Sequence, residues 1–80
     1  MKARVVVMPK NDVLDPQGRA VAGALHSLGF DRVDQVRVGK IIELDLGPVE
    51  AHQASEQVSQ MCQKLLANTV IEEFSFELLE

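Results

Sequence analysis

Apolar and polar residues follow one another in short runs that predict four strands. Residues 3–8 are rich in β-branched valine and apolar on both sides, so this strand is expected to be covered on both faces. Residues 31–38 alternate weakly at first and then well, which suggests a half-buried strand. Residues 41–46 and 74–78 alternate clearly, and each of these strands is expected to have one apolar face and one polar face.

The first of two predicted helices covers residues 16–28. Asp15 precedes a proline, so its backbone is pushed toward an extended conformation and its carboxylate can accept hydrogen bonds as the N-cap. Pro16 suits the first helical position, where a missing N–H costs nothing. Gly29 supplies a left-handed C-cap. Five apolar residues recur at helical spacing and predict the buried stripe: Ala20, Val21, Ala24, Leu25 and Leu28.

The second predicted helix lies between the third and fourth strands and ends near Asn68. Its apolar residues fall at steps of three and four, which predicts the following stripe: Ala51, Ala54, Val58, Met61 and Leu65. Cys62 lies beside this stripe, and no histidine has a spacing that would place a base next to it. We therefore expect a buried or half-buried free thiol and no nucleophile.

The predicted order β-α-β-β-α-β indicates an α+β, ferredoxin-like, two-layer sandwich with an antiparallel sheet and two helices, completed by oligomerisation. Gly39 and Lys40 offer a two-residue type II′ hairpin between the second and third strands. If the first two strands are parallel arms of a right-handed βαβ unit, their C-terminal ends meet the start of the first helix. The polar residues gathered at this candidate functional edge would be Lys10, Asp12, Asp15, Gln17, Arg19, Arg37 and Lys40.

Length and charge narrow the class of protein. Eighty residues make a single small domain, residues 1–80, which buries only about 60% of its unfolded surface and is marginal alone, so we expect a partner surface. The net charge of -4 argues against nucleic acid and against an acidic membrane as partners. One cysteine cannot form an internal disulfide, and no apolar run reaches membrane length. The chain reads as cytoplasmic.

No pattern in the sequence predicts a catalytic, cofactor or metal site. The two glycine-rich phosphate-binding motifs, G-x-x-x-x-G-K-[ST] and G-x-G-x-x-G, are both absent. At the start of the first helix, the Asp15 carboxylate competes for the backbone amides that a phosphate would need. His26 and His52 lie on different helices without metal-ligand spacing. Phe74 and Phe76 could stack on RNA bases, but they lie on an acidic strand and core packing accounts for them better. The residues alone predict a small α+β module that associates.

Four runs of the chain resemble the PurS family, and they reach nearly from end to end. The first run is long and specific. The order of the runs and their spacing along the chain are also those of the family. The runs are residues 13–21, 24–30, 36–40 and 61–68. Two positions depart from the family pattern, because Asp12 stands where glycine is common and Thr69 where proline is typical.

The resemblance implies a role without catalysis. PurS is the small subunit of phosphoribosylformylglycinamidine synthase, the glutamine- and ATP-dependent step of purine synthesis. In the family, the synthetase subunit PurL uses ATP and Mg²⁺ and binds formylglycinamide ribonucleotide, while the glutaminase subunit PurQ releases ammonia. PurS bridges them so that the ammonia reaches the synthetase. The resemblance also implies a homodimer or higher homo-oligomer, and no cofactor bound by this chain.

The matched positions and the predicted edge together give a set of expected partner-interface residues: Lys10, Asp15, Gln17, Gly18, Arg37, Gly39 and Lys40. Gly18 and Gly39 can equally be required by backbone geometry, so their role stays open. A rival hypothesis from another class is a stand-alone ligand-sensing or oligomerisation module, because a fold does not determine a function.

Overall fold

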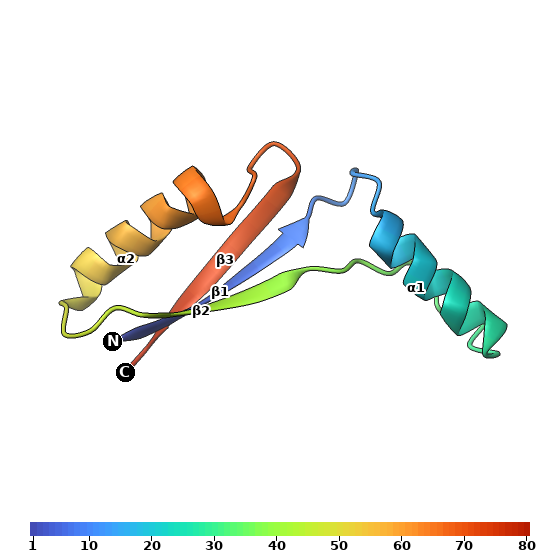
Figure 1. The fold of residues 1–80 in the computed structure, drawn as a ribbon, viewed down its shortest axis with the longest axis horizontal. Coiled ribbons are helices and arrows are strands. Elements are labelled where there is room, and N and C mark those ends of the chain that lie inside the picture. Colours follow the sequence, from blue (N-terminus) through green and yellow to red (C-terminus); the bar gives the residue numbers. More distant parts are fainter.

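The structure is a computed structural model that describes residues 1–80, with a three-stranded antiparallel sheet and two helices (Figure 1). In chain order the elements are β1 (Lys2–Pro9), α1 (Pro16–Ser27), β2 (Lys40–Asp45), α2 (Ala51–Met61), the π-helical turn η1 (Cys62–Leu66) and β3 (Glu72–Leu79). The strand order is β2-β1-β3, with β1 antiparallel to both neighbours. The expected α+β class is therefore confirmed.

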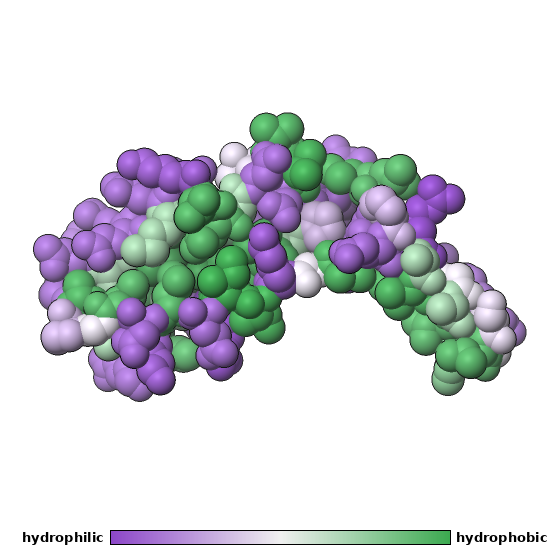
Figure 2. All heavy atoms as spheres, in the orientation of Figure 1, coloured by the Kyte–Doolittle hydropathy of each residue, from purple (hydrophilic) through white to green (hydrophobic).

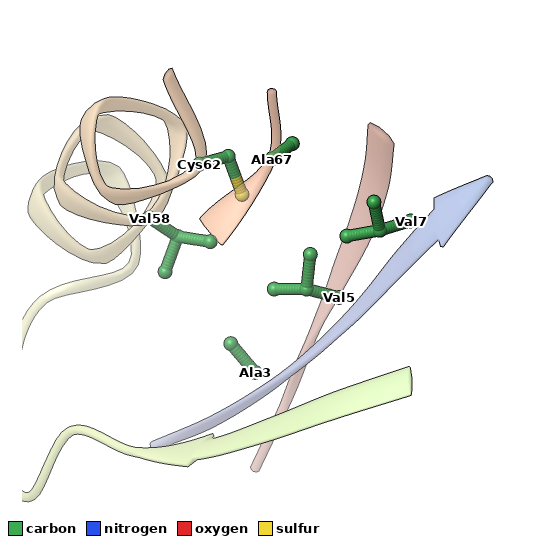
Figure 3. Close-up of a cluster of buried hydrophobic side chains, with 6 residues drawn as sticks. All are labelled: Ala3, Val5, Val7, Val58, Cys62 and Ala67. Atoms are coloured by element: carbon green, nitrogen blue, oxygen red, sulfur yellow. The ribbon is translucent and has the colours of Figure 1, made fainter. Parts of the chain in front are cut away.

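The buried core lies between β1 and the helix that continues into η1. Ala3, Val5 and Val7 alternate along β1 and point toward α2 and η1 (Figure 3). From the other side they meet Val58 and Cys62, and Ala67 closes the cluster. Removing these apolar side chains from water is the main force that holds α2 on the sheet.

The buried stripe of the second helix differs from the predicted one. Ala54, Val58 and Cys62 are fully buried, whereas Ala51, Met61 and Leu65 are exposed, Leu65 by 82%. For Leu65 the reason is the π-helical turn, in which the amide of Ala67 donates to the carbonyl of Cys62 five residues earlier. The wider turn rotates the following residues relative to an α-helix, so a stripe counted at α-helical spacing loses its register there.

The opposite face of the sheet is open, and the prediction that β1 is covered on both faces is wrong for the single chain. Val6 and Met8 are half-buried on this face, and Ile41 is 64% exposed. Arg4 lies between two carboxylates of the neighbouring strands, 3.6 Å from Glu43 and 3.7 Å from Glu77. Opposite charges on adjacent strands suit a face that meets water.

The predicted second strand does not join the sheet. Residues 33–39 run without sheet pairing from the end of α1 directly into β2, whose Lys40 pairs with Val7 (Figure 1). Gly39 has no positive φ, so the type II′ hairpin at Gly39 and Lys40 is absent. The parallel βαβ arrangement is absent as well, because both sheet pairs are antiparallel.

Helix α1 stands away from the sheet, together with the segment that follows it (Figure 1). We call residues 10–39 the arm and the rest of the chain the body. The arm makes the molecule 49 Å long, 26 Å wide and 14 Å thick. The predicted stripe of α1 is largely uncovered, since Val21 is 41% exposed and Leu28 is 73% exposed. Gly18 is the one buried residue of this helix.

Candidate functional site

Asp15 fastens the arm at its base through two backbone hydrogen bonds. Its Oδ1 accepts from the amide of Gly18 at 3.1 Å, as predicted for an N-cap. Its Oδ2 accepts from the amide of Val38 at 2.8 Å, across 23 residues of sequence. The bonds from Val38 and then Gly18 stabilise the charged carboxylate and lower the pKa of Asp15 below its ordinary value. One side chain thus ties the start of α1 to the segment that returns to the sheet.

Two glycines allow the backbones to approach closely at this base. A Cβ on Gly18 would overlap the carbonyl oxygen of Val36, and a Cβ on Gly39 would overlap the Met8 side chain and the Val7 carbonyl. Gly18 therefore lets α1 lie directly on the returning segment, and Gly39 lets that segment lie directly on β1. Backbone geometry alone requires glycine at both positions.

Arg37 and Lys10 connect the arm to the end of the sheet. Arg37 Nη1 donates to the carbonyl of Pro9 at 3.0 Å and lies 3.5 Å from a carboxylate oxygen of Glu73. The amide of Lys10 donates to the carbonyl of Ile71 at 2.9 Å. The arm therefore leaves the body at the end of β1 and the start of β3, where several backbone and side-chain bonds fix its direction.

The structure brings most of the predicted edge together, for a reason other than parallel strands. We call the region around Asp15, Gly18, Arg37 and Gly39 the junction. Lys40 is exposed beside it on β2 and forms no ion pair, Gln17 is exposed on the first turn of α1, and Lys10 is half-buried. Pro9, Val36, Val38 and Glu73 complete the junction and were not predicted. No local pattern could have indicated them, since their contacts span more than fifteen residues of sequence.

A small cavity of about 240 Å³ opens at the junction between α1 and the returning segment. Its lining is mixed in polarity and includes Asp15, Arg19 and Arg37. Elsewhere, Cys62 is fully buried, as expected, and desolvation raises the pKa of its thiol. His26 and His52 are exposed, and no group of His, Cys, Asp and Glu side chains could hold a metal ion. No helix has the length and apolar character to cross a membrane.

The fold and the junction define a small α+β protein in which one helix packs on an antiparallel sheet and the other is carried outward on an arm. Comparison with known proteins shows which family this chain belongs to. The family PurS, described as phosphoribosylformylglycinamidine (FGAM) synthase, matches residues 2–80. The chain belongs to the PurS family.

Relatives from distant organisms share nearly the whole chain. The phosphoribosylformylglycinamidine synthase subunit PurS of Synechocystis sp. is 51% identical over 94% of this chain and 75% of its own length. Among solved structures, Bacillus subtilis PurS in its C2 crystal form is 47% identical and superposes with a TM-score of 0.88, covering 99% of this chain and 98% of that chain. A chain in the structure of PurLQS from Thermotoga maritima is 31% identical with a TM-score of 0.85, covering 98% and 95% respectively.

Proposed function

We propose that this chain is the non-catalytic bridging subunit of a glutamine- and ATP-dependent phosphoribosylformylglycinamidine synthase in de novo purine biosynthesis. The observation that carries the proposal is the likeness to a chain in PurLQS, because it extends over 98% of this chain and includes the outward arm. The same likeness favours bridging over the stand-alone sensing module.

In this proposal the partners supply the chemistry. The glutaminase subunit PurQ releases ammonia from glutamine, and the synthetase subunit PurL uses ATP and Mg²⁺ to activate its substrate. This chain holds the two together so that ammonia passes between them, and it binds no cofactor itself. All three subunits would work in the cytoplasm. The bridge itself would be a homodimer or a higher homo-oligomer.

The junction and the residues beside it are the proposed contact surface for these partners. Lys40 and Gln17 offer exposed polar side chains, and Lys10 is half-buried. Arg37 is held by Pro9 and Glu73, so it presents a positioned positive charge at the rim. Asp15, Gly18 and Gly39 act through the backbone, because they set the angle at which the arm leaves the sheet.

The test is reconstitution of synthase activity from purified PurL, PurQ and this chain, with either glutamine or free ammonia as nitrogen source. A bridging subunit is needed only for the glutamine-dependent rate, because free ammonia reaches the synthetase without a glutaminase. We expect omission of this chain to abolish that rate and to leave the ammonia-dependent rate intact. Equal glutamine-dependent rates with and without the chain would refute the proposal.

A further inference from the structure

The open face of the sheet carries a cleft at the end where the arm leaves the body. The cleft has a volume of about 450 Å³, and ligand pockets in proteins measure about 300–1,000 Å³, so its size suits a small molecule. Apolar side chains reach the surface where the body meets the arm (Figure 2). The lining of the cleft comes from β1, the returning segment and β2: Val6, Met8, Arg37, Gly39, Lys40 and Ile41.

The floor of the cleft is apolar. Val6 and Ile41 are paired neighbours on β1 and β2, and Met8 follows Val6 on the same face of β1. The Met8 sulfur lies directly against Gly39, where a Cβ would overlap it. Ile41 is 64% exposed, and Val6 and Met8 are half-buried, so part of this floor is in contact with water. An aromatic ring lying on the floor would remove this surface from water, and methionine sulfur favours contact with such rings.

The two charged residues in the lining are both basic, in a chain whose net charge is -4. Arg37 Nη1 contacts the carbonyl of Pro9 and the carboxylate of Glu73, and these contacts fix the position of the guanidinium. Arg37 Nε and Nη2 have no partner in the chain and are free to donate. Lys40 is exposed and forms no ion pair. Glu73 offsets one positive charge only, so the lining keeps the charge of Lys40 uncompensated.

Two other hollows of the surface are less suited to an anion. At the other end of the same sheet face, Arg4 lies between Glu43 and Glu77, so its positive charge is more than compensated. The cavity at the junction has two arginines in its lining, but Asp15 and Asp34 line it as well. Nearby carboxylates repel an anion, and the lining of the cleft contains none. The cleft thus combines an apolar floor with a positively charged end.

We propose that this cleft binds a small anion with an aromatic body, of the chemical class of a nucleoside monophosphate. The ring lies on Met8 and Ile41. The phosphate accepts hydrogen bonds from Arg37 and Lys40, since both a guanidinium and an ammonium group suit phosphate oxygens. This site goes beyond the bridging role, which assigns no ligand to the chain. The test uses the full chain without PurL and PurQ, so its outcome is separate from the outcome of the activity assay.

The first measurement is a titration of the isotope-labelled chain with adenosine monophosphate, followed by the NMR shifts of its backbone amides. We expect saturable shifts at Met8, Gly39 and Ile41, with a dissociation constant of about 1 mM or lower. Adenosine and inorganic phosphate each supply one half of the interaction and should bind at least about tenfold more weakly. The proposal is overturned if these amides show no saturable shift. It is also overturned if either half binds as tightly as the nucleotide, because the floor and the positive end would then not act together.

Two variants test the two halves of the site. Lys40→Met removes the charge, and Ile41→Ser removes apolar surface from the floor; each should weaken binding of adenosine monophosphate by at least about fivefold. The matched controls are Lys2→Met, at the opposite end of β1, and Val70→Ser, at a side chain that is 79% exposed. The affinities of both controls should stay within about twofold of wild type. Lys40→Met or Ile41→Ser that binds as well as its control would overturn the proposal.

Nuclear Overhauser contacts locate the ring without any variant, so the test holds even if a substitution disturbs the fold. We expect contacts between the adenine protons and the side-chain methyl groups of Met8 and Ile41. Contacts only to residues outside the cleft would place the nucleotide elsewhere and overturn the proposal.

Discussion

At the residue scale, Asp15 combines a local role with a long-range one. The cap on Gly18 was predictable from sequence, because Asp before Pro specifies both the extended backbone and the free amides. The bond from Val38 was not, because it depends on a segment 23 residues away. The same limit applies to Gly18 and Gly39, where the sequence left two roles open and the structure provides a backbone reason for both.

Substitutions at Asp15 should distinguish how much each of its two hydrogen bonds contributes to stability. Asp15→Ala loses both acceptors, and we expect the melting temperature to fall by about 5 °C, the usual scale of a lost cap in a small domain. Asp15→Asn keeps one oxygen for Gly18 but presents an amide group, itself a donor, toward Val38. The melting temperature of Asp15→Asn should lie between that of the wild type and that of Asp15→Ala. Equal melting temperatures for wild type and Asp15→Ala, measured by calorimetry, would contradict the anchoring role.

The bonds of Asp15 also predict a pH dependence. Its folded pKa is lowered, mainly by the Val38 and Gly18 amides, so the carboxylate stabilises the folded state fully above the unfolded pKa, near 3.8. This stability is lost as the pH falls through the lower folded pKa. The difference in melting temperature between wild type and Asp15→Asn should therefore be constant from about pH 5 to pH 7 and shrink below about pH 3.8. A difference that grows on acidification would reverse the assigned sign.

At the element scale, the three strands of the sheet and both helices were predictable, and the unpaired segment at residues 31–38 was not. β1, β2 and β3 follow their apolar patterns. The alternation of Val36 and Val38 with polar residues predicted a strand, because such alternation indicates an extended segment with one apolar side. It does not indicate whether a strand or a helix covers that side. Here α1 covers one side of that segment and no strand pairs with it. For α2, the π-helical turn displaced Leu65 from the predicted stripe.

The revised stripe predicts which helix position carries the core. Val58 is fully buried against β1, so Val58→Ala should cost about 2 kcal/mol of unfolding free energy through lost burial and the cavity left behind. Val70→Ala removes the same atoms from a side chain that is 79% exposed and should cost under about 0.5 kcal/mol. Urea unfolding at one protein concentration measures both. Similar losses for the two variants would show that the core is misassigned.

At the scale of the whole molecule, the outward arm separates the junction from the rest of the surface. The sequence predicted that Asp15 and Arg37 would come together there, although the parallel strands invoked for it do not form. The gathering occurs because the arm leaves and returns at one end of β1. The overall length of 49 Å was beyond prediction, since composition alone suggests a compact small domain.

Charge reversal at Lys40 should weaken complex assembly without changing the fold. Lys40 is exposed and unpaired at the junction, so Lys40→Glu should leave the melting temperature within about 2 °C of wild type. The concentration needed for half-maximal glutamine-dependent activity should rise by about tenfold or more. The matched control is Lys2→Glu, because Lys2 is an exposed lysine at the opposite end of β1. This control should leave the concentration for half-maximal activity unchanged. If both variants behave alike, the proposed contact surface is wrong.

The position of β1 in the centre of the sheet also determines when the protein can fold during its synthesis. β1 is translated before both strands that it pairs with, residues 40–45 on one side and residues 72–79 on the other, so the pairing of Ala3 with Leu78 cannot form until β3 has been made. Such long-range pairing makes folding slow and late. A nascent chain on the ribosome therefore carries an unpaired, valine-rich strand through most of its elongation, which is the condition under which chaperones are most needed.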